Sequence, residues 1–146
     1  MPEAVVAITG ASGAQYGVRL VDELLNAGWS VSLIVTNAGA INLDLECGIA
    51  PEVLGERDGV TLEDNGNLAA RAASGSARFD AYVVCPASGT TIGKIAAGIS
   101  DNLATRSALV ALKERRKLIL VPRETPVSTP HLEAMARMSS WGVVIL

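Results

Sequence analysis

The segment AVVAITGASGAQYG (4–17) constrains the fold of this 146-residue chain more than any other part of it. A short apolar run (4–8) leads into a glycine-containing turn, and an amphipathic stretch follows at once. This order predicts a strand, a tight turn and a helix, whose free backbone N–H groups favour a bound phosphate. The glycines are spaced G-x-x-G-x-x-x-G (Gly10, Gly13, Gly17), which differs from the dinucleotide fingerprint G-x-G-x-x-G. A glycine turn with a purely structural role is the alternative interpretation.

Further apolar runs have the pattern of buried strands, and helical segments separate them. The expected strands are 4–8, 30–35, 81–85, 118–122 and 142–146, with at most one short strand in the irregular segment 50–66. The expected helices are 15–27, 92–97, 103–115 and 131–139, with weaker helical character over 40–50 and one helical turn within 68–73. Strands joined through helices imply right-handed crossovers. We therefore expect a single α/β domain over residues 1–146, a doubly wound parallel sheet of the Rossmann-like or flavodoxin-like type.

Four polar loops follow the ends of the predicted strands. They are 9–13, 36–39, 86–91 and 123–128. In doubly wound sheets a ligand binds beyond the carboxyl ends of the strands, so these loops lie along one binding rim. Their glycines and hydroxyls favour a phosphorylated ligand, and Ser12 is placed to contact it. The cluster Ser88-Gly89-Thr90-Thr91 fits the same rim, with a plain helix N-cap as the alternative.

The composition excludes several classes of function. A net charge of −3 offers no electrostatic case for nucleic acid. No apolar run reaches the roughly 18 residues that a membrane span needs, and the start of the chain does not have the pattern of a signal peptide. Cys47, Cys85 and the single histidine, His131, do not have the spacing of a zinc site, so we expect no metal. Two isolated thiols without a signal peptide indicate the cytoplasm.

Several charged residues are candidates for chemistry. Arg123 and Glu124 directly follow the strand LILVP, where a buried charge costs several kcal/mol unless it is paired. Glu124 is a candidate general acid or base, and an ion pair that holds the loop is the alternative. Arg106 and Lys113 are seven residues apart on one helix face, where they could meet a phosphate or a neighbouring subunit.

Two other titratable residues carry weaker signals in their sequence context. Glu46 falls near the end of a weakly helical segment and, on its pattern alone, is a surface residue. His131 falls at the start of a helix, which favours a capping or core role over a catalytic one.

Taken together, these segments resemble the flavin prenyltransferase family, the UbiX-like branch of the flavin-containing cysteine decarboxylase superfamily. TGASGAQYGVRL resembles the family's opening motif, CPASGTT its second flavin loop, and DNLATRSALVALKERRKLILVPRETPVSTPHLEAM is the most specific match. The resemblance covers nearly the whole chain. It implies a flavodoxin-like fold, reduced FMN as substrate, and transfer of a dimethylallyl group from dimethylallyl phosphate to the flavin N5 and C6, without a metal. It also implies homo-oligomers, commonly dodecamers, with active sites at subunit contacts, and a partner decarboxylase that uses the prenylated FMN.

The resemblance also assigns roles to individual positions. FMN contacts fall on Gly10, Ala11, Ser12, Thr36, Ser88, Gly89, Thr90, Thr91, Arg106 and Arg123. The resemblance implies catalytic roles for Ser12, Glu46 and Glu124. It also implies that Lys113 and Arg123 bind the phosphate of the prenyl donor. Many relatives have Met-Lys where this chain has Gly89-Thr90, so a lysine contact is missing here. Thr36 keeps the hydroxyl of a family serine.

One departure from the family keeps other functions open. Relatives continue past the final strand into a segment with a tyrosine and basic residues that clamp the prenyl phosphate, whereas this sequence ends at Leu146. If that segment is truly absent, we expect FMN to bind and prenyl transfer to be impaired. A non-catalytic FMN carrier is therefore one alternative. An FMN-dependent cysteine decarboxylase is a second alternative. The sequence argues against it, because those enzymes use an early histidine and an Asn-containing motif that this chain lacks.

Overall fold

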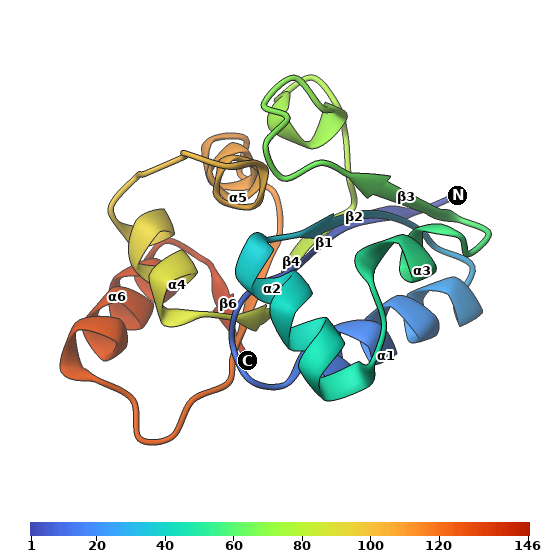
Figure 1. Cartoon of the computed structure of the whole chain (residues 1–146). Coiled ribbons are helices and arrows are strands. Elements are labelled where there is room, and N and C mark those ends of the chain that lie inside the picture. The colour runs from blue at the N-terminus through green and yellow to red at the C-terminus, as the bar shows by residue number, and fades with distance from the viewer.

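The strands of the computed structural model, which describes residues 1–146, form one parallel six-stranded sheet (Figure 1). The strands are β1 (Glu3–Ile8), β2 (Ser30–Val35), β3 (Val60–Glu63), β4 (Ala81–Ala87), β5 (Leu118–Pro122) and β6 (Val144–Ile145). Their order across the sheet is β3-β2-β1-β4-β5-β6. This is the order of a doubly wound sheet, so the predicted α/β fold is confirmed.

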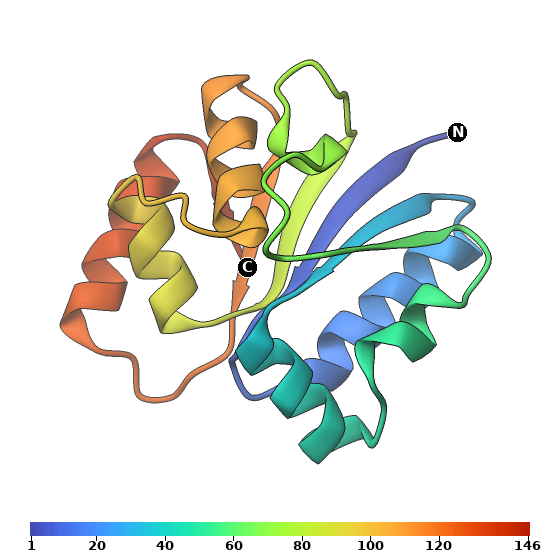
Figure 2. The same ribbon diagram turned by 45° about the horizontal axis from the view of Figure 1, so that its top comes forward.

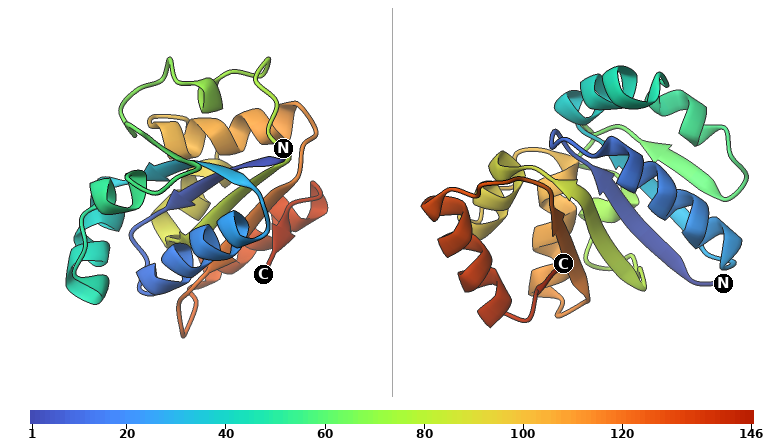
Figure 3. Two further views of the ribbon diagram at one scale, coloured as in Figure 1. Left: turned by 90° about the vertical axis from the view of Figure 1, so that its right-hand side faces the viewer. Right: turned by 90° about the horizontal axis from the view of Figure 1, so that it is seen from below.

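Helices cover both faces of the sheet. They are α1 (Ala14–Asn26), α2 (Asn37–Asn42), α3 (Pro51–Gly55), α4 (Gly89–Ala96), α5 (Leu103–Lys113) and α6 (Thr129–Ser140), with a π-helix η1 (Leu43–Cys47) and a 3₁₀ turn η2 (Arg71–Ala73). Figure 2 shows α1, α2 and α3 on one side of the sheet and α4, α5 and α6 on the other. In the left view of Figure 3 the strands pass between α5 and α1. No helix is long and apolar enough to cross a membrane.

The core divides into two apolar clusters because successive residues of each strand point to opposite faces. On β1, Ala4, Val6 and Ile8 pack toward α1, η1 and α3. Val5 and Ala7 of the same strand pack toward α4, α5 and α6. All five side chains are buried, as expected for a central parallel strand covered on both faces.

The structure differs from the sequence prediction mainly in the polar segments. The segment 50–66 contains α3 as well as β3, so the expected fifth strand at the end of the chain is the sixth. The expected turn at 36–39 is the start of α2, with Thr36 as its N-cap. The helix expected to begin at residue 92 begins at Gly89, because the Ser88 side chain accepts a hydrogen bond from the Thr91 N–H and caps it. The helix expected to run to residue 115 ends at Lys113.

The neighbouring strands β1 and β4 mark the point where the strand order reverses. The chain leaves β1 toward α1 on one face and leaves β4 toward α4 and α5 on the other. The two loops therefore separate and open a crevice at the carboxyl ends of these strands, where ligands of doubly wound sheets bind.

Candidate functional site

Two adjoining cavities occupy this crevice. The first, about 340 Å³, is lined by Gly10, Ala11, Ser12, Ala87, Ser88, Gly89, Arg123, Glu124 and Thr125. The second, about 290 Å³, is lined by Gly10, Thr36, Asn37, Ala38, Asn65, Ser88, Thr90, Thr91, Lys94 and Asn102. Gly10 and Ser88 border both cavities, so the two form one elongated site. The structure thus brings the predicted loops after β1, β2, β4 and β5 together at one rim.

A buried threonine joins the two central loops. The Thr9 hydroxyl donates to the Pro86 carbonyl at 2.6 Å and accepts from the Ser88 N–H at 2.8 Å. Its side chain is fully buried at the end of β1. Thr9 therefore fixes where Ser88 stands relative to the first glycine loop. The sequence prediction missed this role, although a hydroxyl at the end of an apolar strand is a visible signal.

Replacing Thr9 by valine keeps the shape of the side chain and removes both hydrogen bonds. Leaving buried partners unsatisfied costs about 1–3 kcal/mol, so we expect the free energy of unfolding to fall by about that amount and FMN to bind more weakly. Urea unfolding and flavin titration measure the two effects. Thr61→Val, an exposed position on β3, is the matched control and should change stability by less than about 0.5 kcal/mol. Equal effects of the two substitutions would contradict the role of Thr9.

The first glycine loop is held by residues of α2 and η1. Gly13 begins α1 in the left-handed conformation (φ 111°) and has no side chain to cap the helix. The Glu46 carboxylate does this instead, because its Oε1 accepts from the N–H groups of Gly13 at 2.8 Å and Ala14 at 3.0 Å. The Asn42 amide donates to the Ala11 carbonyl at 3.0 Å. Glu46 therefore holds the glycine loop from 33 residues away, which its surface-like sequence pattern did not indicate, and it lines neither cavity.

The start of α4 has the features of a phosphate site. The Ser88 hydroxyl accepts from the Thr91 N–H and donates to the Thr91 hydroxyl, which fixes both side chains. The N–H groups of Gly89 and Thr90, in the first turn, have no hydrogen-bond partner within the chain. Free N–H groups and the helix dipole together favour an anion. Lys94, which sequence reasoning overlooked, lines the same cavity one turn after Thr90 and pairs with Asp101 at 3.0 Å.

The first cavity carries the charged groups that follow β5. The Arg123 side chain lies against Gly13, where a Cβ would come within 3.0 Å of its Cγ. Arg123 and Glu124 form no ion pair with each other. Glu124 faces His131 of α6 instead, with Oε2 3.8 Å from Nδ1. His131 was expected to have a capping or core role, and the structure places it beside a candidate acid.

The cysteines do not offer a nucleophile at neutral pH. Burial raises the pKa of the Cys85 thiol to about 11. Burial and the neighbouring Glu46 carboxylate raise the pKa of Cys47. Because the thiolate is the reactive form, both side chains remain protonated and act as small apolar groups.

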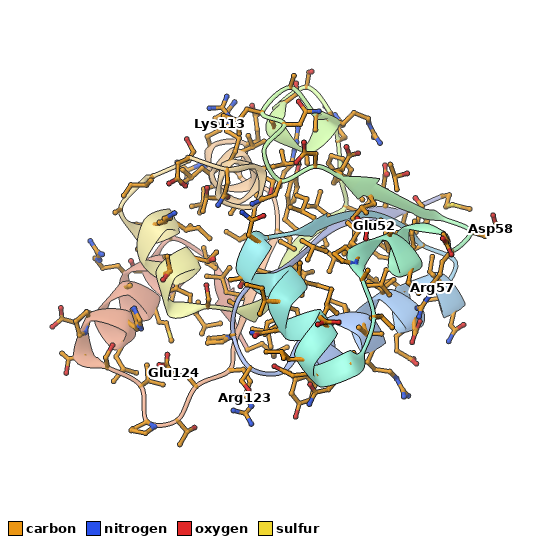
Figure 4. The ribbon with its side chains drawn as sticks, in the orientation of Figure 1. Glu52, Arg57, Asp58, Lys113, Arg123 and Glu124 are labelled. Atoms are coloured by element: carbon orange, nitrogen blue, oxygen red, sulfur yellow. The ribbon has the colours of Figure 1, made fainter.

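Arg106 and Lys113 lie outside the two cavities. They share one side of α5, as predicted, but that side faces η2 and the segment that follows it. The Arg106 guanidinium donates to the Ala73 carbonyl at 3.4 Å, and Lys113 pairs with Glu114 at 2.8 Å. Figure 4 shows Lys113 far from Arg123 and Glu124. Within one copy of the chain, the predicted phosphate pair of Lys113 and Arg123 does not come together.

A third and larger cavity, of about 830 Å³, adjoins the second and has the wrong charge for a phosphate. Its lining includes Glu52, Glu63 and Asp64. Three carboxylates repel an anion, whereas the second cavity offers hydroxyls, free N–H groups and Lys94. The charges therefore favour a phosphate at the start of α4 over one in this third cavity.

Comparisons with known proteins agree with this geometry. The flavoprotein family model matches residues 2–146. The flavin prenyltransferase UbiX of Halalkalibacterium halodurans is 43% identical over 97% of this chain and 73% of its own length. The crystal structure of AnUbiX (PadA1) in complex with FMN and dimethylallyl pyrophosphate superposes with a TM-score of 0.94 at 35% identity, over 99% of this chain and 76% of that one. A dodecameric FMN-dependent UbiX-like decarboxylase from Escherichia coli O157:H7 gives a TM-score of 0.93 at 37% identity, over 98% of this chain and 78% of that one.

The resemblance noted in the sequence is thus confirmed over the whole chain, in both sequence and fold. The cavities at the β1/β4 crevice and the loops around them are those expected for a bound flavin. The chain belongs to the flavin prenyltransferase (UbiX) family of flavoproteins.

Proposed function

We propose that this chain transfers a dimethylallyl group from dimethylallyl phosphate to N5 and C6 of reduced FMN. One observation carries the proposal: a phosphate-binding helix start and a cavity with Arg123 and Glu124 adjoin through the shared residues Gly10 and Ser88. One site can thus hold a flavin phosphate at one end and a reacting allylic phosphate at the other. The relatives favour prenyl transfer over a flavin carrier or a cysteine decarboxylase.

The second cavity is the proposed position of the FMN phosphate. The Thr36 hydroxyl accepts from the Gly39 N–H and caps α2, so it borders the cavity in a fixed orientation. Ser88, Thr91 and the free N–H groups of Gly89 and Thr90 complete the set. Lys94 adds a cation to the same cavity one helical turn after Thr90, the position at which many relatives have a lysine. These groups hold the phosphate by hydrogen bonds and charge.

The first cavity is the proposed site of group transfer. FMN supplies the nucleophilic ring atoms N5 and C6. The allylic C–O bond of the donor breaks, the dimethylallyl carbons bond to the ring, and phosphate leaves. Arg123 lines this cavity and can stabilise the charge of the departing phosphate. Glu124 can move the protons that alkylation and ring closure require. Ser12 lines the same cavity, and Glu46 holds the glycine loop to which Ser12 belongs.

A homo-oligomer is the proposed working form, because Arg106 and Lys113 do not reach the cavities of their own chain. The relative from Escherichia coli is dodecameric. In such an assembly these two cations can reach the cavity of a neighbouring copy and complete the phosphate site. Two further statements stay predictions: that a decarboxylase receives the product, and that the protein is located in the cytoplasm.

The proposal is tested by mass spectrometry of the flavin released after anaerobic incubation with reduced FMN and the donor. Dimethylallyl phosphate and dimethylallyl pyrophosphate should be supplied in separate reactions, because they differ only in the leaving group. A gain of one prenyl unit supports the proposed transfer. Binding of FMN without any mass gain from either donor would contradict it and favour the carrier function.

The double substitution Ser88→Ala with Thr91→Ala should weaken FMN binding. A hydrogen bond to a charged group contributes about 1.5–3 kcal/mol, so we expect the Kd for FMN to rise roughly 10- to 100-fold. Fluorescence titration measures this change. Ser107→Ala removes a buried hydroxyl that donates to Ala104 on α5, outside both cavities, and should leave the Kd unchanged. An unchanged Kd in the double variant would remove this loop from the phosphate site.

A further inference from the structure

The His131 imidazole occupies the space beside Gly89 that a side chain would otherwise fill. A Cβ at Gly89 would lie 2.1 Å from the His131 Cε1 and 2.6 Å from its Nδ1. Gly89 does not have a positive φ, so its backbone conformation is open to other residues. The close approach of the imidazole therefore accounts for glycine at this position. It also means that the imidazole in this position excludes a larger residue at position 89.

The same imidazole faces the candidate acid of the reaction site. Its Nδ1 is buried, makes no hydrogen bond, and lies 3.8 Å from the Glu124 Oε2. That separation is within ion-pair range but too long for a hydrogen bond. An unpartnered buried nitrogen is costly, and Glu124 is the carboxylate within reach. The Glu124 side chain is 53% exposed on a loop between β5 and α6, so it has room to approach.

We infer that His131 is a positioning residue for Glu124. The Nδ1–H donates to the carboxylate when the first cavity is filled, and the missing side chain at Gly89 gives the imidazole its place. Catalytic hydrogen bonds are often long in empty sites and shorten when substrate binds. The donated hydrogen bond fixes one carboxylate oxygen and turns the other toward the reacting atoms. This inference rests on the proposed prenyl transfer, because it assigns how the acid of that reaction is oriented.

Three substitutions at His131 separate positioning from mere packing. Asparagine places an amide nitrogen near the position of Nδ1, glutamine places it near Nε2, and leucine fills the space without a donor. We expect His131→Asn to keep most of the prenylation kcat. His131→Gln and His131→Leu should lower it roughly tenfold, a part of the roughly 10²–10⁴ that a placed acid or base supplies. The Kd for FMN should stay within twofold in all three. Equal kcat for the asparagine and leucine variants would overturn the inference.

Gly89→Ala tests the same contact from the other side. The added Cβ must displace the imidazole, so this variant should lose kcat to the same extent as His131→Leu. The double variant should be no slower than either single one, because both remove one interaction. Independent, additive losses would show that Gly89 and His131 do not act through a shared position.

A spectroscopic measurement keeps the inference separate from the proposed function. The chain has a single histidine, so ¹⁵N NMR of the imidazole needs no assignment by mutation. In the FMN-bound protein we expect Nδ1 to carry the proton and its signal to shift in Glu124→Gln. An unprotonated Nδ1 that is insensitive to Glu124→Gln would overturn the inference even if the wild type prenylates FMN. The expected NMR result in a protein that fails to prenylate would instead uphold the contact and reject the function.

Discussion

Glu124→Gln is expected to leave FMN binding intact and to slow prenyl transfer by roughly 10²–10⁴-fold, the contribution of a placed general acid or base. Glutamine keeps the size of the side chain and an acceptor oxygen, but it cannot take up and release a proton at neutral pH. Glu124 lines the first cavity and is not part of the phosphate-binding helix start, so the Kd for FMN should change little. Single-turnover kinetics under anaerobic conditions measure the rate, and flavin titration measures the binding.

The matched control for this prediction is Glu133→Gln. Glu133 lies on α6, is exposed, and borders neither cavity, so the same change of charge should leave the rate unaffected. If Glu124→Gln turned over at the wild-type rate, Glu124 would not be the proton-transfer group. If both variants slowed equally, the effect would come from net charge and not from the site.

Gly17→Ala is expected to destabilise the protein by up to about 2 kcal/mol. Gly17 is where α1 packs on the sheet, and an added Cβ would lie 2.6 Å from the Cys85 carbonyl oxygen and 2.8 Å from the Ile8 side chain. A backbone carbonyl cannot move aside as a flexible side chain can, and overpacking costs about 1–3 kcal/mol. Alanine recovers about 1 kcal/mol through its higher helix propensity, so packing decides the sign. Thermal unfolding should show a Tm lower by up to about 8 °C.

Gly93→Ala is the control with the opposite expected sign. Gly93 also lies inside a helix, α4, but no atom comes within 4 Å of the position of an added Cβ. The helix propensity gain then acts alone and should stabilise the protein by about 0.5–1 kcal/mol. A stabilising Gly17→Ala would show that α1 can move away from β1 and β4, contrary to the close packing described above.

The sequence by itself determined the layers of the fold and the rim on which the site lies. The strands 30–35 and 118–122 were predicted with the bounds that the structure has. Each is a short apolar run between polar segments, so its signal is contained within a few neighbouring residues. The polar loops that follow the strands were predictable for the same reason, and the topology rule for parallel sheets placed them on one edge.

The local predictions that were wrong have a local cause. The helix α3 begins with a proline and lies in a segment rich in polar residues and glycine, so no apolar periodicity reveals it. The helix α4 begins three residues before its apolar stretch, because the Ser88 side chain caps it. In both cases capping and packing override a weak hydrophobic pattern.

Only the tertiary structure decided which side chains meet at the site. Thr9 contacts Pro86 across 77 residues, and Glu46 caps α1 from 33 residues away. His131 reaches Gly89 and Glu124, while Lys113 stays away from Arg123 (Figure 4). Such contacts depend on how strands and helices pack against each other over long stretches of chain. A pattern of neighbouring residues indicates burial and periodicity, but it does not indicate the distance between two side chains that are remote in the sequence.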